Sequence, residues 1–157
     1  MKYFRVAYDE HVYSTGGYDP DDEWTRDSTE TDITVNGVVE VDDMVFSDLY
    51  LADGPVDRLF MVWCRYTTGD SFGRDTGRAE WVSLHRDLEV AEKNAMRIRE
   101  HDRRNGTSSR SSSTVKLLTD EGKEYMCYAP WVGFFERLED IIVQSVDVLE
   151  EKLVKRY

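Results

Sequence analysis

Apolar runs with strand periodicity recur along the chain, separated by polar and glycine-containing stretches. Residues 2–8 are rich in aromatic and β-branched side chains and predict a strand, and residues 79–85 predict another. In residues 59–66, both the odd-numbered and the even-numbered positions are mainly apolar, which predicts a central strand covered on both sides. Its faces would present Leu59, Met61 and Trp63 on one side, and Phe60, Val62, Cys64 and Tyr66 on the other.

Turn residues predict two β-hairpins. Asn36-Gly37 stands between two β-type runs at residues 33–35 and 38–41, and such a pair is a strong signal for a two-residue turn. A second hairpin is expected to join residues 115–118 to residues 123–129. The polar stretch before the first hairpin, residues 9–31, has the composition of a long loop.

Two segments show helical spacing of apolar residues. The first covers residues 87–103, where Asp87 is the expected cap. The second, residues 131–157, predicts a long C-terminal helix that packs across a sheet or forms the seam of a homo-oligomer. Its apolar stripe would consist of Phe134, Leu138, Ile141, Ile142, Ser145, Leu149 and Leu153.

These elements together predict an α+β fold, mainly an antiparallel sheet of hairpins with two helices packed on it, one of them the long C-terminal helix. A length of 157 residues fits a single domain that spans residues 1–157. No internal repeat and no linker divide the chain.

Charge is distributed unevenly along this expected domain. The formal net charge is −12, and residues 1–57 contain three basic and fifteen acidic residues, so this acidic N-terminal third accounts for all of it. Such an asymmetry disfavours direct binding to nucleic acid or a membrane and favours a partner protein with a basic surface. The alternative is an acidic surface that only keeps the protein in solution. The candidate contact residues are Asp19, Asp21, Asp22, Glu23, Asp42, Asp43 and Asp48.

Several classes of function find no support in the sequence. The start of the chain has no apolar signal-peptide core, and no run has the length of a membrane span, which predicts a cytoplasmic protein. Cys64 and Cys127 each lie in an apolar run, as expected for buried thiols. No common catalytic or metal-binding motif occurs, and residues 19–23 lack the spacing of a calcium loop, so we predict no cofactor and no metal. A function other than catalysis is therefore favoured.

The segment of residues 67–78 has an unusual composition for a connection between two strands. Its three glycines, Gly69, Gly73 and Gly77, would allow backbone N–H groups to surround an anion, with arginines adding contacts to phosphate. Asx and ST turns that only shape the segment are the alternative, because no strand-to-helix junction follows the glycines. The candidate ligand-binding residues are Thr68, Gly69, Asp70, Ser71, Arg74 and Arg78, and Asp70, Asp75 and His85 are candidates for acid–base chemistry.

The run YTTGDSFG at residues 66–73, followed by a strand and a helix, resembles a motif of the form Y-[ST]-T-G-D-S-F-G. This motif is found in small uncharacterised accessory proteins encoded by tailed bacteriophages, and the resemblance covers residues 59–100. It implies a viral accessory protein that acts in the cytoplasm of a bacterial host, and it carries over no catalytic residue.

The sequence thus supports two hypotheses. The first is a phage-like accessory protein that binds a host protein through the acidic surface and inhibits or redirects it. The alternative is a binder, or a weak hydrolase, of a nucleotide or small phosphorylated ligand that uses residues 67–78. A virion component built through the long helix is a further alternative.

Overall fold

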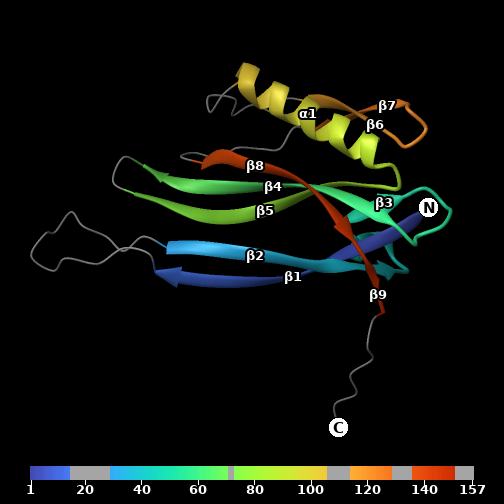
Figure 1. Cartoon of the computed structure of the whole chain (residues 1–157), viewed down its shortest axis with the longest axis horizontal. Coiled ribbons are helices and arrows are strands. Elements are labelled where there is room, and N and C mark those ends of the chain that lie inside the picture. Colours follow the sequence, from blue (N-terminus) through green and yellow to red (C-terminus); the bar gives the residue numbers. More distant parts are fainter. Residues whose placement is uncertain (15–28, 71–72, 106–113, 129–135, 151–157) are drawn as a thin grey trace, which may run out of the picture.

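The computed structural model describes residues 1–14, 29–70, 73–105, 114–128 and 136–150, which form three stacked layers (Figure 1). Two of the layers are β-sheets that face each other, and the third contains a helix and a small hairpin. The helix and the small hairpin come from one stretch, residues 88–128, whereas each sheet combines N-terminal or central strands with one strand from the C-terminal part of the chain. Mainly antiparallel sheets with a helix on one side agree with the predicted α+β class, although only one helix is present among the described residues.

The middle sheet is built around β4 (Leu59–Asp70), which pairs antiparallel with β5 (Gly73–His85) and with β8 (Glu136–Val146). Both faces of β4 are buried, as its sequence predicted. One core, facing the other sheet, contains Leu59, Met61 and Trp63, and the other core, facing the helix, contains Val62, Cys64 and Tyr66.

The outer sheet has the strand order β3-β1-β2-β9. The long strands β1 (Lys2–Ser14) and β2 (Thr29–Val41) are antiparallel and lie along the middle sheet. The short strand β3 (Leu49–Leu51) follows a single 3-10 turn, η1 (Met44–Phe46), and pairs with β1. The last strand, β9 (Val148–Leu149), runs parallel to β2. The predicted loop at residues 9–31 is therefore wrong at residues 9–14 and 29–31, which are strand.

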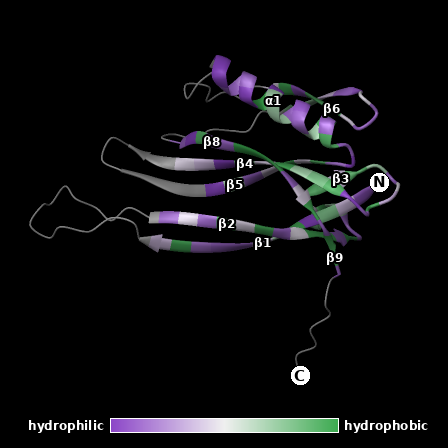
Figure 2. Cartoon of the chain, in the orientation of Figure 1, coloured by the Kyte–Doolittle hydropathy of each residue, from purple (hydrophilic) through white to green (hydrophobic). Residues whose placement is uncertain are grey.

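The third layer covers the opposite face of the middle sheet. Helix α1 (Leu88–Asn105) packs there through Ala91 and Ile98, while its outward side is largely hydrophilic (Figure 2). As predicted, Asp87 caps the helix, and its Oδ1 accepts a hydrogen bond from the Glu89 amide at 2.9 Å. Beside the helix, β6 (Thr114–Leu118) and β7 (Glu124–Tyr128) form the second predicted hairpin.

The helix predicted over residues 131–157 is wrong for the described residues, because residues 136–146 form β8 and residues 148–149 form β9. Residues 131–135 and 151–157 lie outside the described residues. The error has an identifiable cause at Glu139. In the pairing with β4, Arg65 lies opposite Asp140 and Tyr66 opposite Leu138, so Glu139 is an extra residue in a β-bulge. The bulge puts Leu138 and Ile141 on the same face at a spacing of three, which resembles a helical stripe. The prediction of a homo-oligomer through this helix therefore loses its structural basis.

The first predicted hairpin is also wrong, because β2 continues through Asn36-Gly37. Ala7 pairs with Gly37 and Tyr8 with Val35, which leaves Asn36 as a bulged residue instead of a turn residue. Gly37 has a φ of +156°, and a Cβ atom added there would lie 2.6 Å from the carbonyl oxygen of Asp147. Glycine is required here because β9 approaches the backbone of β2.

The predicted loop at residues 67–78 is replaced by an extension of two strands. The backbone of β4 runs to Asp70, β5 begins at Gly73, and the two strands stay paired up to these residues. No described helix is long and apolar enough to cross a membrane.

Candidate functional site

The candidate acidic residues fall into two groups. Residues 19–23 lie outside the described residues, whereas Asp42, Asp43 and Asp48 flank η1, the turn between β2 and β3. The three residues of η1 are apolar and exposed: 64% of Met44, 78% of Val45 and 68% of Phe46 is accessible. The structure therefore adds an apolar surface to the acidic one. We call residues 42–48 the acidic-apolar turn.

Hydrogen bonds fix the conformation of the acidic-apolar turn. Asp43 accepts a hydrogen bond from the Val45 amide through Oδ1 at 2.9 Å, and the Ser47 amide donates to the Met44 carbonyl oxygen at 3.1 Å. Asp48 Oδ2 accepts from the Val6 amide of β1 at 2.8 Å. Two of the three acids thus have structural roles as well as charge. The backbone of the turn is thus fixed in a conformation that leaves the three apolar side chains exposed.

The backbone of the glycine-containing segment continues the paired strands β4 and β5. Thr68 pairs with Asp75 and Gly69 with Arg74 across β4 and β5. Ser71 lies outside the described residues, as do the side chains of residues 68–77. Binding of an anion by Thr68, Gly69, Asp70, Ser71 and Arg74 therefore stays a prediction, and only Arg78 of the candidate set has a described side chain.

Arg78, the remaining candidate ligand, is held by contacts with other residues of the protein. Its Nε donates to Glu136 Oε2 at 2.8 Å, and its guanidinium carbon lies 4.0 Å from the centre of the Tyr66 ring. The Tyr66 hydroxyl donates in turn to Glu80 Oε2 at 2.8 Å. Burial, and to a lesser extent Glu80, raise the pKa of Tyr66 above its usual range, so the phenol stays a proton donor. This network ties β4, β5 and β8 together.

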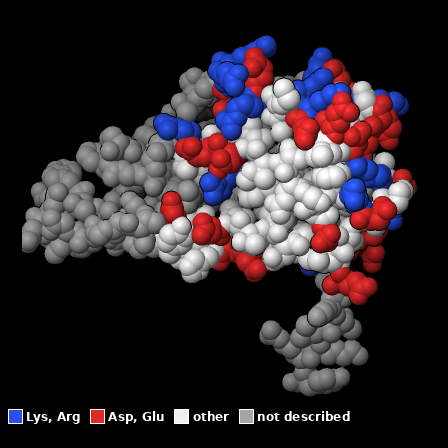
Figure 3. Space-filling model, viewed as in Figure 1, with Lys and Arg blue, Asp and Glu red and all other residues white. Residues whose placement is uncertain are grey.

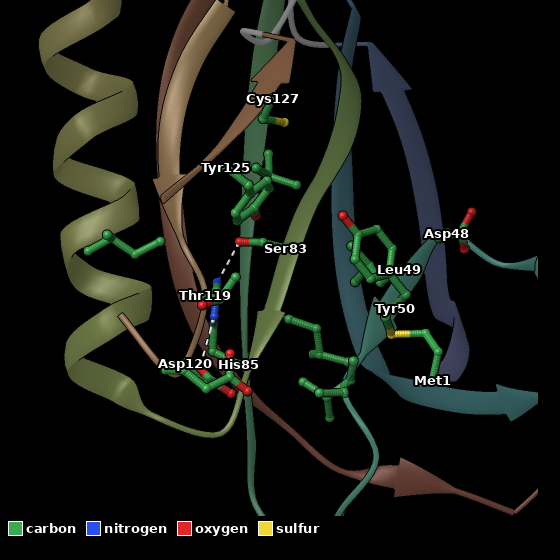
Figure 4. A pocket seen from close by; sticks show the side chains of 16 residues that line it. Met1, Asp48, Leu49, Tyr50, Ser83, His85, Thr119, Asp120, Tyr125 and Cys127 are labelled. Carbon is green, nitrogen blue, oxygen red and sulfur yellow. Dashed lines mark hydrogen bonds and ion pairs between the residues drawn. The ribbon is translucent and has the colours of Figure 1, made fainter. Parts of the chain in front are cut away.

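A pocket of about 390 Å³ lies between β3, the end of β5 and the β6–β7 hairpin (Figure 4). Most of its wall is apolar, including Leu49, Leu51 and Leu84, and Tyr50 and Tyr125 contribute aromatic rings. Polar side chains enter from β5 and from the turn between β6 and β7. A pocket of this size and lining is typical of a small-molecule site.

Three of the polar side chains form a hydrogen-bonded series. Ser83 and His85 alternate with Leu84 along β5, so both point toward the third layer. The Ser83 Oγ lies 2.8 Å from His85 Nε2, and His85 Nδ1 lies 3.1 Å from Asp120 Oδ1. The second oxygen of Asp120 accepts from the Arg86 amide at 2.9 Å. The order is that of a hydroxyl, a base and an orienting carboxylate.

Asn94 of α1 determines the tautomer of His85. The Asn94 Oδ1 accepts from the Leu118 amide at 2.7 Å, so its Nδ2 is the group that lies 3.1 Å from His85 Nε2. An amide NH₂ can only donate, and Nε2 must therefore be an unprotonated acceptor. The ring proton then sits on Nδ1 and is donated to Asp120.

Burial keeps this imidazole neutral. Only 3% of His85 and 6% of Ser83 is exposed, and Asn94 is fully buried. Desolvation lowers the pKa of His85 below its ordinary value of 6.5, and the neighbouring Asp120 only partly opposes this effect. His85 is thus present as a free base at neutral pH.

Sequence reasoning found only one member of this cluster. His85 was a candidate for acid–base chemistry, but its partners come from the same strand, from α1 and from the turn between β6 and β7. The Ser-x-His spacing on a predicted strand was the available signal, because alternate residues share a face.

No family model, no curated protein and no solved structure matches this chain. Among the described residues, no group of three or more His, Cys, Asp and Glu side chains is arranged to hold a metal ion. The acidic-apolar turn and the pocket are therefore interpreted from their own geometry.

Proposed function

We propose that this chain is a protein-binding protein, and that the acidic-apolar turn is the centre of its contact surface. The observation that carries the proposal is the exposure of Met44, Val45 and Phe46, three consecutive apolar residues at 64–78%. Contiguous exposed apolar side chains surrounded by polar ones are typical of protein contact sites. The partner that fits is a protein with an apolar pocket rimmed by Lys and Arg.

The hydrogen bonds within the turn support this function. Because Asp43 and Ser47 already fix the turn, binding would order few additional groups. A preorganised contact loses less conformational entropy on association than a mobile one. Phe46 is the best candidate for the central anchor, since buried aromatic side chains contribute most to such interfaces.

The charge distribution supports a basic partner. Asp42 and Asp43 lie directly beside the apolar residues, and the chain as a whole carries −12. Basic residues gather instead over α1, at the top of Figure 3, in the layer on the other side of the middle sheet. A basic protein would therefore be steered toward the outer sheet rather than toward the helix.

The resemblance of residues 59–100 to phage-encoded proteins suggests where the partner is found. We infer a bacterial host protein that is inhibited or redirected when the acidic-apolar turn occupies its binding pocket. A pocket that normally accepts phosphate groups would have the required basic rim. The resemblance also supports a cytoplasmic location for the encounter.

Binding to proteins of a bacterial lysate, compared between matched variants, tests the proposal. Val45→Ser/Phe46→Ser removes the apolar contact, and Asp42→Asn/Asp43→Asn removes two charges while asparagine can still cap the turn. Met96→Ser is the matched control, because Met96 is 72% exposed on α1. Captured proteins are then purified and their Kd values measured at about 0.05 M and about 0.5 M salt.

The proposal predicts a partner that binds the wild type and Met96→Ser equally. Its affinity should fall at least about tenfold for the serine double variant, which corresponds to roughly 1.4 kcal/mol. The asparagine double variant should bind more weakly, mainly at low salt. Equal affinity of all variants for every captured protein, or no captured protein at low salt, would refute it.

A further inference from the structure

We propose that Ser83 is a nucleophile that accepts the acyl group of a small, neutral, apolar ester, with His85 as its general base and Asp120 as the positioning residue. This activity uses the pocket between β3, β5 and the β6–β7 hairpin. It is a separate activity from the protein-binding function proposed above, because neither Ser83 nor His85 belongs to the acidic-apolar turn. Asp48 is a residue of that turn that also lines the pocket.

The first support is the mutual geometry of the three side chains. A nucleophilic serine needs a base within hydrogen-bond reach, and the base needs a third group that fixes its orientation. Ser83 Oγ and His85 Nε2 are 2.8 Å apart, and His85 Nδ1 and Asp120 Oδ1 are 3.1 Å apart. The main-chain amide of Arg86 holds the Asp120 carboxylate in place. These are the roles of the serine, histidine and aspartate in hydrolytic triads, which recur on unrelated folds.

The second support is the protonation state of the base. The contact from Asn94 Nδ2 requires a lone pair on His85 Nε2, which is the nitrogen that faces Ser83. The proton on Nδ1 faces Asp120, so the imidazole has the tautomer that can accept the Ser83 proton. When Nε2 becomes protonated, the Asn94 amide must turn away or lengthen its contact. Asn94 is thus expected to moderate the basicity of His85.

The third support is the pocket in front of these groups. Its volume of about 390 Å³ suits a small molecule, and its walls include Leu49, Leu51 and two tyrosines. Among the described residues that line it, the charged side chains are Asp48, Asp120 and Glu121, and none is Lys or Arg. The N-terminal ammonium of Met1, which also lines the pocket, is paired with Asp53 Oδ1 at 2.8 Å. Carboxylates disfavour phosphorylated and other anionic substrates. The lining therefore favours a neutral ester with a short apolar acyl group.

The reaction is an acyl transfer in two steps. The Ser83 oxygen attacks the ester carbonyl while its proton passes to His85 Nε2, and the new bond joins the serine oxygen to the acyl carbon. The bond between the acyl carbon and the alkoxy oxygen then breaks, and the leaving alcohol takes the proton from His85. Water repeats the sequence on the acyl-serine, which releases the carboxylic acid and restores Ser83.

A fluorophosphonate probe and p-nitrophenyl butyrate test the proposal on the full chain. The expected result is a covalent adduct on Ser83, located by peptide mass spectrometry, and p-nitrophenol release that falls to the buffer rate in Ser83→Ala. Ser145→Ala, which changes an exposed serine of β8, is the matched control and should retain the wild-type rate. The fold of each variant is verified by circular dichroism.

The pH profile separates the positioning role of Asp120 from a purely structural one. With a buried, neutral base, wild-type labelling should persist below pH 6.5 and decline only at lower pH. Asp120→Asn should reduce the labelling rate about a hundredfold and alter the profile, while a structural role would change stability alone. Folded wild-type protein that forms no adduct at Ser83, or Ser83→Ala that hydrolyses the ester as fast as wild type, would overturn the proposal.

Discussion

Replacing Gly37 with alanine is expected to destabilise the protein through two separate effects at one position. The first is the backbone, because a φ of +156° is rarely adopted by residues with a side chain. The second is space, because the new Cβ would lie 2.6 Å from the Asp147 carbonyl oxygen and 2.8 Å from Leu149 Cγ. Both neighbours belong to the segment that brings β9 alongside β2, so this segment must move.

The expected fall in the free energy of unfolding has two contributions, from backbone strain and from a lost hydrogen bond. An unfavourable backbone conformation costs about 1 to 3 kcal/mol. Displacement of the β9 segment also removes the hydrogen bond from the Val38 amide to the Asp147 carbonyl oxygen, which is 2.9 Å long, at a net cost of about 1 kcal/mol. The free energy of unfolding should therefore fall by about 2 to 4 kcal/mol.

Gly122→Ala is the matched control. Gly122 also has a positive φ, +83°, but a Cβ atom there would meet nothing within 4 Å. Gly122→Ala should therefore lower the free energy of unfolding only through its unfavourable backbone conformation, by about 1 to 2 kcal/mol. Urea unfolding of both variants gives the two free energies, and hydrogen exchange of the Val38 amide reports on β9 directly. Wild-type protection of that amide in Gly37→Ala, together with equal losses in the two variants, would refute the reasoning.

Three further predictions concern the buried cluster and the exposed turn. Asn94→Ala should lower the free energy of unfolding by about 2 to 5 kcal/mol in urea, because both backbone groups of Leu118 lose their buried partner. Since the pKa of folded His85 is lowered, the unfolded chain binds the extra proton, and stability should fall as pH decreases below 6.5, by at most about 1.4 kcal/mol per pH unit. Val45→Ser/Phe46→Ser should change the unfolding free energy by less than about 0.5 kcal/mol per residue.

Each of these has a result that would contradict it. Glu92→Ala, on the exposed side of the same helix, is the control for Asn94→Ala, and equal losses in the two variants would mean that the buried amide contributes little. A pH dependence that is the same in His85→Gln as in wild type would assign the titration to another group. A loss above about 2 kcal/mol in the serine double variant would mean that the turn packs against the core.

Elements could be predicted from the sequence where their residue pattern is compatible with only one local structure. Residues 59–66 are apolar on both faces, and only burial on both sides satisfies such a strand, so the prediction for β4 was confirmed residue by residue. The Asp87 cap and the β6–β7 hairpin were predictable for the same reason, because their local chemistry agrees with the fold.

Prediction failed where tertiary pairing determines the outcome. Asn36-Gly37 has the composition of a turn, but pairing of β1 with residues on both sides of it keeps the chain extended through a bulge. Glu139 is bulged in the same way, which changes the side-chain alternation of β8 into an apparent helical stripe. A single sequence contains no information on which residues lie opposite each other, so neither bulge could be recognised.

The candidate site was predictable only in part. Asp42, Asp43 and Asp48 were predicted as contact residues from charge alone, whereas the exposure of the apolar residues between them follows from the position of η1, none of whose residues is buried. His85 was recognised from its chemistry, whereas its contacts with Asn94 and Asp120 depend on how the third layer is placed on β5. Side chains from separate elements meet only after the layers assemble.

The position of β8 in the middle sheet has a consequence for folding of the newly made chain. Strand β4 is translated long before β8, and the paired residues Arg65 and Asp140 are 75 positions apart. Until β8 is synthesised, one edge of β4 remains unpaired and part of both cores is uncovered. The two cores therefore close late, and chains interrupted before residue 136 should expose a long apolar strand edge that favours aggregation.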